Sequence, residues 1–432
     1  MVLLVESGMK ARVVAKSATL PLFDVQVGQR AYAAAPMSGF VEYIRSFCEF
    51  GSATLETEKD DIPYFVNEFW TSSQRAAHSI HEVSYRACFK PQLPRFFIEN
   101  LTMPGDIVLD PFMGRGTTPI EAHLNRRRAF GNDINPLSLL LTRPRLEIPK
   151  VADIERVLKS VPWEKGKIDR EDLLVFYHPA TLRRLCALRD WLAREAPLAE
   201  SRPDPAADWV RMVAINRLTG HSPGFFSVRT MPPNQAVSIE SQRKINEKNK
   251  QEPSEKNIAH LILKKTKSLL SDGTPKANLD FQLYCGPADQ LSSIYDGVVS
   301  LLVTSPPFLD IVQYADDNWL RCWFAGIDVE SINIAMHRDE RLWQDMVARV
   351  LREAARVLRD GGYVAFEVGE VRGGKLLLEK LVWSAAEGLP FERICVVVNE
   401  QSFTKTSNCW GVSNNSKGTN SNRIVILRRL PR

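Results

Sequence analysis

Two short runs of the sequence combine glycine, proline and hydroxyl residues at points where a strand is expected to end. The first run, Asp110-Pro-Phe-Met-Gly-Arg-Gly-Thr-Thr118, follows the apolar residues 106–110 and precedes a helical pattern that starts at Pro119. The second run, Thr304-Ser-Pro-Pro-Phe308, follows the apolar residues 298–303. A glycine turn between a strand and a helix is typical of nucleotide-type binding sites, although it can also be a plain tight connection.

The residues around the glycine turn narrow the kind of ligand. A dinucleotide fingerprint would need a third glycine at position 119, where the chain has proline, and the Gly-Lys-Ser/Thr of a phosphate loop is absent. Asp110 at the strand end would repel a pyrophosphate but could pair with an ammonium group. Asp133 ends the next expected strand, 128–133. In Rossmann-like folds an acid at this position binds the ribose hydroxyls of the ligand. These features favour S-adenosylmethionine, which carries both an ammonium group and a ribose.

The second run has the groups needed to activate an exocyclic amine of a nucleobase. Such an amine is a poor nucleophile because its lone pair is conjugated with the ring. The hydroxyl oxygen of Ser305 and the carbonyl of Pro306 could accept its two N–H bonds and aim the nitrogen, while Pro306 and Pro307 stiffen the loop. Phe308 would stack on a base extruded from the duplex. The alternative is a Pro-Pro turn after a strand.

Together the two runs resemble the amino-directed DNA methyltransferases of the Thr-Ser-Pro-Pro-Phe type. The segment Tyr85-Arg-Ala-Cys-Phe89-Lys-Pro-Gln-Leu-Pro94-Arg-Phe-Phe97 is similar to the one that precedes the glycine turn in permuted members and closes over the methionine end of the cofactor. The resemblance implies that Ser305, Pro306, Pro307 and Phe308 are catalytic. It further implies that S-adenosylmethionine is bound by Phe89, Lys90, Pro91, Asp110, Pro111, Phe112, Gly114, Gly116, Thr117, Thr118, Asp133, Asn135 and Asp289. Within this set, Asp133 would hold the ribose hydroxyls, Asp289 would approach the adenine, and Gly116 would leave space for the adenosyl group.

The resemblance also bears on which amine receives the methyl group. In this family a serine at position 305 is associated with N4 of cytosine, and aspartate or asparagine there with N6 of adenine. We therefore expect a site-specific enzyme that flips cytosine out of double-stranded DNA and acts beside a cognate restriction endonuclease. Adenine-N6 methylation is the first alternative, an RNA amino-methyltransferase the second and a catalytically silent DNA-binding protein the third. Methylation of ring carbon 5 is set aside because the chain has no Pro-Cys dipeptide for its nucleophile.

Strands that alternate with helices predict a doubly wound, mostly parallel α/β sheet of the Rossmann-like class I methyltransferase type. We expect an N-terminal extension over residues 1–74 and a cofactor half over residues 75–150. A helical insertion with Pro-rich joints would follow over residues 151–280, and a catalytic half over residues 281–432. Because little sequence follows the last expected strand, the insertion is the expected target-recognition subdomain. It precedes the third strand, one unit earlier than in the commonest arrangement of the family.

The excess of positive charge is concentrated in the insertion. The whole chain has a formal charge of +5, and residues 241–270 hold eight basic and three acidic side chains. Contacts with DNA phosphates are therefore expected from Arg229, Arg243, Lys244, Lys248 and Lys264. A solvated helix face is the alternative. The polar loop 402–411 is either a second DNA-facing surface or a polar hairpin.

The composition narrows the class of protein further. With 432 residues, 44% of them hydrophobic, the chain can bury a full core. No apolar run approaches the length of a membrane helix, so we expect no membrane partner. We expect the protein to act in the cytoplasm of a prokaryote, in association with the nucleoid. Seven scattered cysteines without a CxxC pair, and histidines without metal-ligand spacing, predict neither disulfides nor a metal site.

Overall fold

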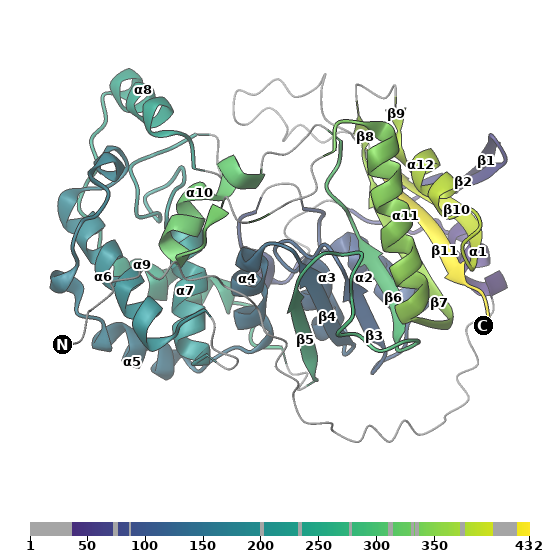
Figure 1. The fold of residues 1–432 in the computed structure, drawn as a ribbon, viewed down its shortest axis with the longest axis horizontal. Helices are drawn as coiled ribbons and strands as arrows, with labels where there is room; N and C mark the ends of the chain where they lie inside the picture. Colours follow the sequence, from purple (N-terminus) through teal and green to yellow (C-terminus); the bar gives the residue numbers. More distant parts are fainter. Residues whose placement is uncertain are drawn as a thin grey trace, which may run out of the picture.

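The computed structural model describes residues 37–71, 77–85, 88–198, 203–231, 236–275, 279–309, 314–329, 332, 337–371, 376–400 and 421–432. A nine-stranded sheet with the order β1-β2-β10-β11-β7-β6-β3-β4-β5 forms its centre (Figure 1). Its strands are β1 (Leu55–Lys59), β2 (Ile62–Asn67), β3 (Ile107–Asp110), β4 (Arg128–Asp133), β5 (Phe281–Cys285), β6 (Val299–Thr304), β7 (Leu358–Val368), β10 (Phe391–Glu400) and β11 (Ser421–Arg429). A separate two-stranded ribbon consists of β8 (Glu370–Val371) and β9 (Leu376–Leu377).

The sheet is mostly parallel. Neighbours from β5 to β7 pair in parallel, whereas β11 runs antiparallel to both β7 and β10. From β3 the chain continues to β4 and β5 on one side, and β6 then lies on the other side of β3. This reversal of direction is the switch point at which doubly wound sheets bind ligands. The expected doubly wound, mostly parallel fold of the class I Rossmann-like type is confirmed.

Helices cover both faces of the sheet. They are α1 (Met37–Ser46), α2 (Gln92–Leu101), α3 (Thr117–Leu124), α4 (Pro136–Leu146), α11 (Glu340–Val357) and α12 (Leu378–Ala385), whereas α10 (Tyr314–Ala325) lies with the helices of the inserted lobe (Figure 1). One buried cluster joins α11 and α12 to one face, and another joins α2, α3 and α4 to the other. Because both faces are covered, the central strands β3 and β6 are buried along their whole length, which explains their unbroken apolar sequences.

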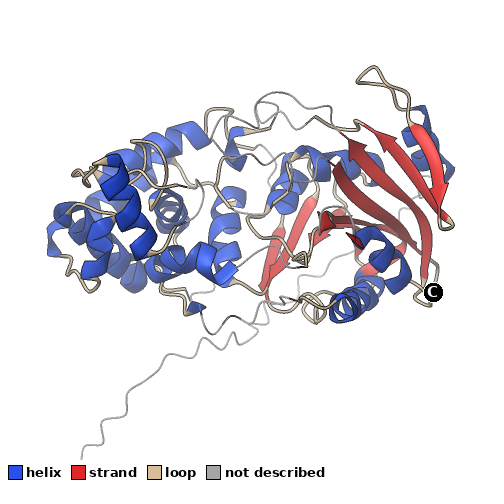
Figure 2. Ribbon diagram, turned by 90° about the horizontal axis from the view of Figure 1, so that it is seen from above, coloured by secondary structure: helices blue, strands red, loops and turns tan. Residues whose placement is uncertain are grey.

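A lobe of helices is inserted between α4 and β5. It contains α5 (Val151–Ser160), α6 (Pro179–Glu195), α7 (Pro205–Arg217), α8 (Ile239–Asn249) and α9 (Ile258–Leu269), with the short 3-10 turns η3 (Trp163–Lys165) and η4 (Glu171–Val175). Figures 1 and 2 both show these helices beside the sheet rather than over it. Helix α10, which follows the Ser-Pro-Pro-Phe run, packs against this lobe: Arg170 lies over the ring of Trp319 at 5.5 Å and Arg189 over Trp323 at 5.1 Å.

The N-terminal region holds elements that the sequence did not indicate. Strands β1 and β2 form a hairpin, and β2 extends the sheet by pairing in parallel with β10. A third short turn, η2 (Ser79–His81), lies between this hairpin and α2. In the part of the chain that the structure describes, no helix is long and apolar enough to cross a membrane.

Candidate active site

The two runs that carry chemistry leave adjacent parallel strands. The glycine turn follows β3 and the Ser-Pro-Pro-Phe run follows β6, and these strands pair through Val108 and Leu109 with Leu301 and Leu302. A hydrogen bond joins the two strand ends, since the Thr304 hydroxyl donates to Asp110 Oδ1 over 2.6 Å. The glycine turn and the Ser-Pro-Pro-Phe run therefore lie side by side at one rim of the sheet.

Asp110 is almost fully buried beneath this rim. Its Oδ1 also accepts the backbone N–H of Phe112, which forms the start of the turn. Burial raises the pKa of the carboxyl to about 7, against the opposing effect of the hydrogen bonds from Thr304 and Phe112. A cation bound beside Asp110 would favour its ionised form.

Asp133, the last residue of β4, holds the glycine turn against this strand. Asp133 Oδ2 accepts the N–H of Gly114 at 2.8 Å, and its Oδ1 accepts the N–H of Asn135 at 2.9 Å. The Asn135 side chain in turn caps α4 by accepting the N–H of Leu137. Burial raises the pKa of the Asp133 carboxyl. One bond to each oxygen leaves lone pairs on the carboxylate for hydroxyl donors of a ligand.

Both glycines of the turn adopt left-handed backbone conformations, with φ of 50° at Gly114 and 76° at Gly116. The reason for glycine at 116 differs from our expectation. A Cβ built there would lie 2.3 Å from the Thr142 hydroxyl of α4, so the close neighbour is a helix of the protein itself. At Gly114 the nearest atom to such a Cβ belongs to the Tyr85 ring, at 3.5 Å.

The remaining cofactor candidates occupy three places around the turn. Pro111 and Phe112 form its first part, and Thr117 and Thr118 begin α3, with the Thr118 hydroxyl bonded to the Val303 carbonyl. Phe89, Lys90 and Pro91 immediately precede α2, and burial beside Arg115 lowers the pKa of Lys90. Asp289 follows β5 and is paired with Arg349 of α11 at 2.8 Å.

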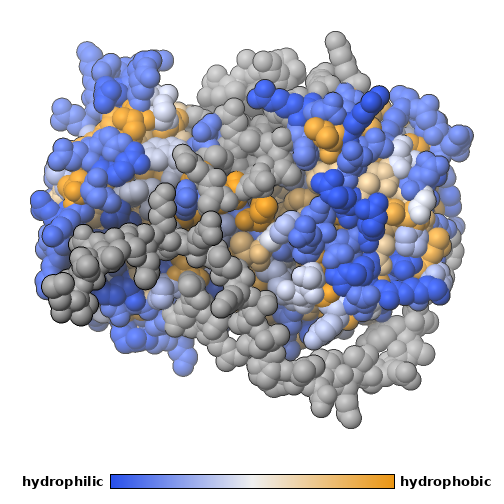
Figure 3. Space-filling model, in the orientation of Figure 1, coloured by the Kyte–Doolittle hydropathy of each residue, from blue (hydrophilic) through white to orange (hydrophobic). Residues whose placement is uncertain are grey.

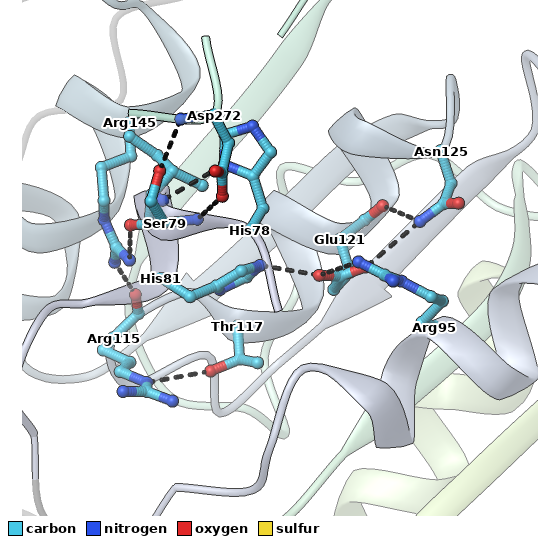
Figure 4. Close-up of polar contacts among 11 residues, drawn as sticks. His78, Ser79, His81, Arg95, Arg115, Thr117, Glu121, Asn125, Arg145 and Asp272 are labelled. Carbon is cyan, nitrogen blue, oxygen red and sulfur yellow. Dashed lines mark hydrogen bonds and ion pairs between the residues drawn. The ribbon is translucent and has the colours of Figure 1, made fainter. Parts of the chain in front are cut away.

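A buried polar network lies behind the glycine turn (Figure 4). Glu121 of α3 is fully buried, and it pairs with His81 at 2.7 Å and with Arg95 at 2.9 Å. Arg145 of α4 is also fully buried and donates to the carbonyls of Leu141, Ile80 and Arg115. The network therefore ties η2 and α4 to the turn.

The same network reaches the inserted lobe. The Ser79 backbone donates to Asp272, just after α9, and its hydroxyl donates to the Leu269 carbonyl. Sequence reasoning missed His81, Glu121 and Arg145. For Glu121 and Arg145, the available signal was a charged residue within a mainly apolar helical segment.

The Ser-Pro-Pro-Phe run is held from the opposite side by α11 and β7. Trp343 donates its indole N–H to the Pro307 carbonyl at 2.9 Å. The Phe308 ring lies over Gly369, where an added Cβ would approach it to 2.8 Å. Ser305, Pro307 and Phe308 are half-buried and Pro306 is buried. Tyr314 and Asp316 begin α10 directly after residues 310–313, which lie outside the described part of the chain.

Sequence reasoning also missed Glu367 of β7, whose carboxylate accepts a hydrogen bond from the Asn422 side-chain amide at 3.0 Å. It is 5% exposed, and burial raises its pKa. A glutamate inside the apolar run Tyr363–Val368 was the available signal.

The predicted phosphate-binding side chains are exposed on the inserted lobe. They are Arg229, and on α8 and α9 Arg243, Lys244, Lys248 and Lys264. Lys244 pairs with Glu240 at 2.6 Å, and both side chains are 72% exposed. The end of the lobe around α8 presents a hydrophilic surface (Figure 3). The polar loop 402–411 and residues 232–235 lie outside the described part of the chain.

Across the described ranges, no group of three or more His, Cys, Asp or Glu side chains is arranged to hold a metal ion. A doubly wound sheet with a glycine turn at its switch point, and with acids at the ends of β3 and β4, is the arrangement of a Rossmann-like fold that binds a ligand at this rim.

Residues 49–140 match the family model N6_N4_Mtase, described as DNA methylase. Among curated proteins, the Type II methyltransferase M.MjaII of Methanocaldococcus jannaschii is 33% identical over 81 residues, which are 19% of this chain and 15% of that protein. The Type II methyltransferase M.MvaI of Kocuria varians is 27% identical over 141 residues, or 32% of this chain and 30% of that protein. Residues 49–140 are therefore similar to DNA methylases of the N6/N4 family.

The matches are partial, since this chain spans under a third of the length of either relative. Among solved structures, the crystal structure of TrmN from Thermus thermophilus overlaps 82% of this chain and 52% of that chain, with 13% identity and a TM-score of 0.32.

Proposed function

We propose that the protein transfers a methyl group from S-adenosylmethionine to the exocyclic amino nitrogen of a DNA base, N4 of cytosine in double-stranded DNA. The single observation that carries this proposal is the hydrogen bond between Thr304 and Asp110. It joins the loop suited to the cofactor to the loop suited to the amine, so that a methyl group and a nitrogen can meet between them.

The residues at the rim fit S-adenosylmethionine. Asp110 offers a carboxyl whose ionised form burial disfavours, and the ammonium group of the methionine end would restore it. Asp133 keeps lone pairs for the ribose hydroxyls. When bound, the cofactor supplies a methyl group made electrophilic by the positive charge on its sulfur.

The chain's own part is to bind and orient the amine. Ser305 Oγ and the Pro306 carbonyl would accept the two N–H bonds of the amine, which localises the lone pair on nitrogen. Phe308 would contact the flipped base while its position over Gly369 keeps the ring in place. The exposed basic side chains on α8 and α9 would hold the DNA backbone.

The choice of cytosine N4 as the methylated atom rests on Ser305 and on the resemblance to the family. Adenine N6 is the second candidate for the same site, because the acceptors needed there are the same. A cognate restriction endonuclease is a proposed partner, in line with the Type II names of the relatives.

Labelled methyl incorporation into DNA and RNA, followed by nuclease digestion and mass spectrometry, tests the reaction and the base together. We expect N4-methylcytosine in DNA. Detection of N6-methyladenine instead would identify adenine as the target base. Label found in RNA alone would overturn the proposal.

In the same assay Ser305→Ala should lower kcat at least about 100-fold, with the cofactor Kd within about twofold of wild type. Ser300→Ala, at a buried serine of β6, the strand that precedes Ser305, is the matched control and should retain activity. An equal loss of cofactor binding and transfer in Ser305→Ala would contradict the assigned role.

A further inference from the structure

Arg217 of the inserted lobe carries a stacked guanidinium that the proposed function does not use. It ends α7 and is half-buried, and its Cζ lies over the Phe225 ring at 3.9 Å from the ring centre. Its Nε donates to the Asn216 carbonyl at 3.0 Å. Within the described residues, Nη1 and Nη2 make no hydrogen bond and no carboxylate pairs with the guanidinium. An arginine supported on a ring in this way keeps its outer N–H groups for a ligand.

The loop after α7 fixes the stacked ring. An added Cβ at Gly220 would lie 2.4 Å from the Phe225 ring, so the absence of a side chain there lets the ring pack closely. The Phe226 N–H donates to the Arg217 carbonyl at 2.8 Å. The Thr230 N–H donates to the Gly220 carbonyl at 3.0 Å. The loop is therefore tied to the end of α7 at two points, and the ring that supports the guanidinium is held in place.

Two cations share one acid around this guanidinium. Burial lowers the pKa of Arg217 to about 10, and the charge of Glu82 opposes that effect. Glu82 already pairs with Lys265 of α9 at 3.0 Å. Burial is the main cause of the lowered pKa of Lys265, and the charge of Arg217 adds to it. An anion bound here would therefore stabilise the charged forms of both cations.

A space suited to an anion lies beside these donors. A Cβ built at Gly224 would lie 4.0 Å from Arg217 Nη1 and 3.8 Å from Ser222 Oγ, and no other non-adjacent described residue comes within 4 Å of it. The Ser222 hydroxyl makes no hydrogen bond within the described ranges. Because Gly224 has no side chain, this position stays open next to a guanidinium and a hydroxyl. The oxygens of a phosphate group can accept hydrogen bonds from both.

The space lies where the lobe meets the catalytic domain. Glu82, the acid nearest to Arg217, precedes Val83, whose carbonyl accepts a hydrogen bond from Arg115 of the glycine turn at 2.9 Å. Arg229, at the other end of the loop, is bonded through its carbonyl to Gln242 of α8 at 3.1 Å. Arg217 is therefore connected to α8 on one side and to the glycine turn on the other. A DNA strand that reaches from α8 to the active site would pass this position.

We propose that Arg217, with Ser222 beside it, binds a backbone phosphate of the DNA in the space next to Gly224. This inference rests on the proposed function, in which DNA is the substrate. A phosphate fits better than a base edge, because the second cation, Lys265, leaves the position with a net positive charge that attracts an anion. The site differs from the exposed lysines of α8 and α9, because its donor is half-buried and held by a ring.

A purely structural role for Arg217 predicts different behaviour. A cation in the last turn of α7 interacts favourably with the helix carbonyls, and its stack on Phe225 stabilises the loop. If that were its whole role, replacing Arg217 would lower Tm but leave the affinity for DNA and its salt dependence unchanged. If Arg217 binds a phosphate, both the affinity and the salt dependence should change in a protein that stays folded.

Arg217→Gln removes the charge and keeps a polar side chain. We expect the Kd for a duplex oligonucleotide to rise roughly 10-fold at low salt, and the slope of log K against log salt to fall by about 1. Fluorescence anisotropy on the cofactor-free protein over a salt series measures both. Because a phosphate contact carries no sequence information, duplexes of different sequence should be weakened alike. A loss confined to particular sequences would assign Arg217 to a base edge and overturn the proposal.

Arg189→Gln is the matched control. Arg189 also stacks on a ring, that of Trp323 at 5.1 Å, but it pairs with Asp169 at 2.8 Å. Its replacement removes the same charge from the same lobe without removing a donor that is open to an anion. The Kd and the salt slope of Arg189→Gln should therefore stay close to the wild-type values. Equal changes in Arg217→Gln and Arg189→Gln would overturn the inference, because they would reflect net charge alone.

Two further variants keep the inference testable if Arg217→Gln folds poorly. Gly224→Val fills the proposed phosphate position while Arg217 keeps its charge, and the backbone at Gly224 is outside the left-handed region. It should weaken DNA binding and lower the salt slope as Arg217→Gln does. Arg217→Lys keeps the charge but loses the planar group that stacks on Phe225, so it should restore part of the slope with a weaker affinity than wild type. A folded Gly224→Val protein that binds DNA like wild type would overturn the inference.

These binding measurements separate the phosphate site from the proposed function. They use the protein without cofactor and do not depend on methyl transfer. An Arg217→Gln protein with the wild-type affinity and salt slope, in a chain whose wild type methylates DNA, would refute the phosphate site alone. A wild-type protein that methylates no DNA, although Arg217→Gln lowers its salt slope, would refute the proposed function instead.

Discussion

The Asp110 side chain has three roles. Its carboxylate joins β3 to β6 through Thr304, holds the first residues of the glycine turn through Phe112, and lies where a cationic ligand is expected. Burial makes the ionised form costly, so the pKa rises to about 7. The folded protein without ligand therefore holds this proton up to neutral pH, whereas the unfolded chain releases it near pH 4.

The sign of this shift predicts how cofactor binding depends on pH. Because the folded state binds the proton more tightly than the unfolded state, the stability that Asp110 contributes is lost as pH rises through about 7. A bound ammonium group would offset that loss. We therefore expect the rise in Tm on adding S-adenosylmethionine to be larger at pH 8 than at pH 6, as measured by differential scanning fluorimetry.

Asp110→Asn tests whether ionisation of Asp110 causes this pH dependence. It keeps the shape and can still accept from Thr304, but it does not ionise, so the difference between pH 6 and pH 8 should disappear. The same difference in wild type and Asp110→Asn would assign the effect to another group.

At the scale of elements, the glycine turn is shaped by the helix behind it. Gly116 precedes α3 with a left-handed backbone, and Thr142 of α4 fills the volume that a side chain at 116 would need. Arg145, one turn further along α4, binds the Arg115 carbonyl. Helix α4 therefore sets the position of the turn by both steric contact and hydrogen bonding.

A pair of glycines separates these two effects. Gly388 has a φ of 72°, close to the 76° of Gly116, but an added Cβ would meet nothing within 4 Å. Gly388→Ala should cost only the strain of the left-handed backbone, about 1 kcal/mol. Gly116→Ala should cost at least about 1 kcal/mol more because it overpacks against Thr142. Chemical denaturation measures both free energies of unfolding.

Thr142→Ala provides the rescue for this test. In the Gly116→Ala background it removes the colliding atoms and should recover the extra loss, but not the backbone strain. Equal costs for Gly116→Ala and Gly388→Ala would show that α4 relaxes away from the turn.

At the scale of the whole molecule, the inserted lobe is connected to the active site from two sides. Helix α10, which leads away from the catalytic run, packs on it through Trp319 and Trp323. Asp272, after α9, holds Ser79 and so the network behind the glycine turn. Helix α8 projects to the same side of the molecule as β8, which follows the end of β7 (Figure 1). A duplex held by α8 would therefore lie on the side where the strands β6 and β7 end.

Charge removal on this lobe tests the proposed DNA contact. Replacing Lys244, Lys248 and Lys264 together by glutamine should weaken DNA binding and lower the slope of log K against log salt by about 2 to 3. Lys244 should contribute least of the three because Glu240 already pairs with it. Fluorescence anisotropy over a series of salt concentrations gives the slope.

The matched control removes three charges from the far end of the lobe. Lys159, Lys165 and Lys167 are exposed near α5, which Figure 1 draws opposite α8. Their replacement by glutamine should leave the salt slope nearly unchanged. Equal changes in the two triple variants would mean that net charge, rather than α8 and α9, drives binding.

Many of the candidate site residues could be predicted from short stretches of sequence. Asp110, Gly114, Gly116 and the Ser-Pro-Pro-Phe run were found from sequence because strand, turn and helix signals depend on neighbouring residues. The type of sheet was also predictable, since strands buried on both faces are apolar throughout. The hairpin of β1 and β2 was missed because β1 is exposed along its length and shows no alternation.

The sequence by itself determined the residues that form the two loops and the class of sheet that holds them, because these follow from local backbone preferences and hydrophobic pattern. Only the tertiary structure decided that Thr304 bonds Asp110, that Thr142 lies behind Gly116, and that Asn422 bonds Glu367. Each of those contacts joins strands or helices that are distant along the chain. Their distances depend on how β6, β3, β7 and β11 are ordered in the sheet, which no local pattern specifies.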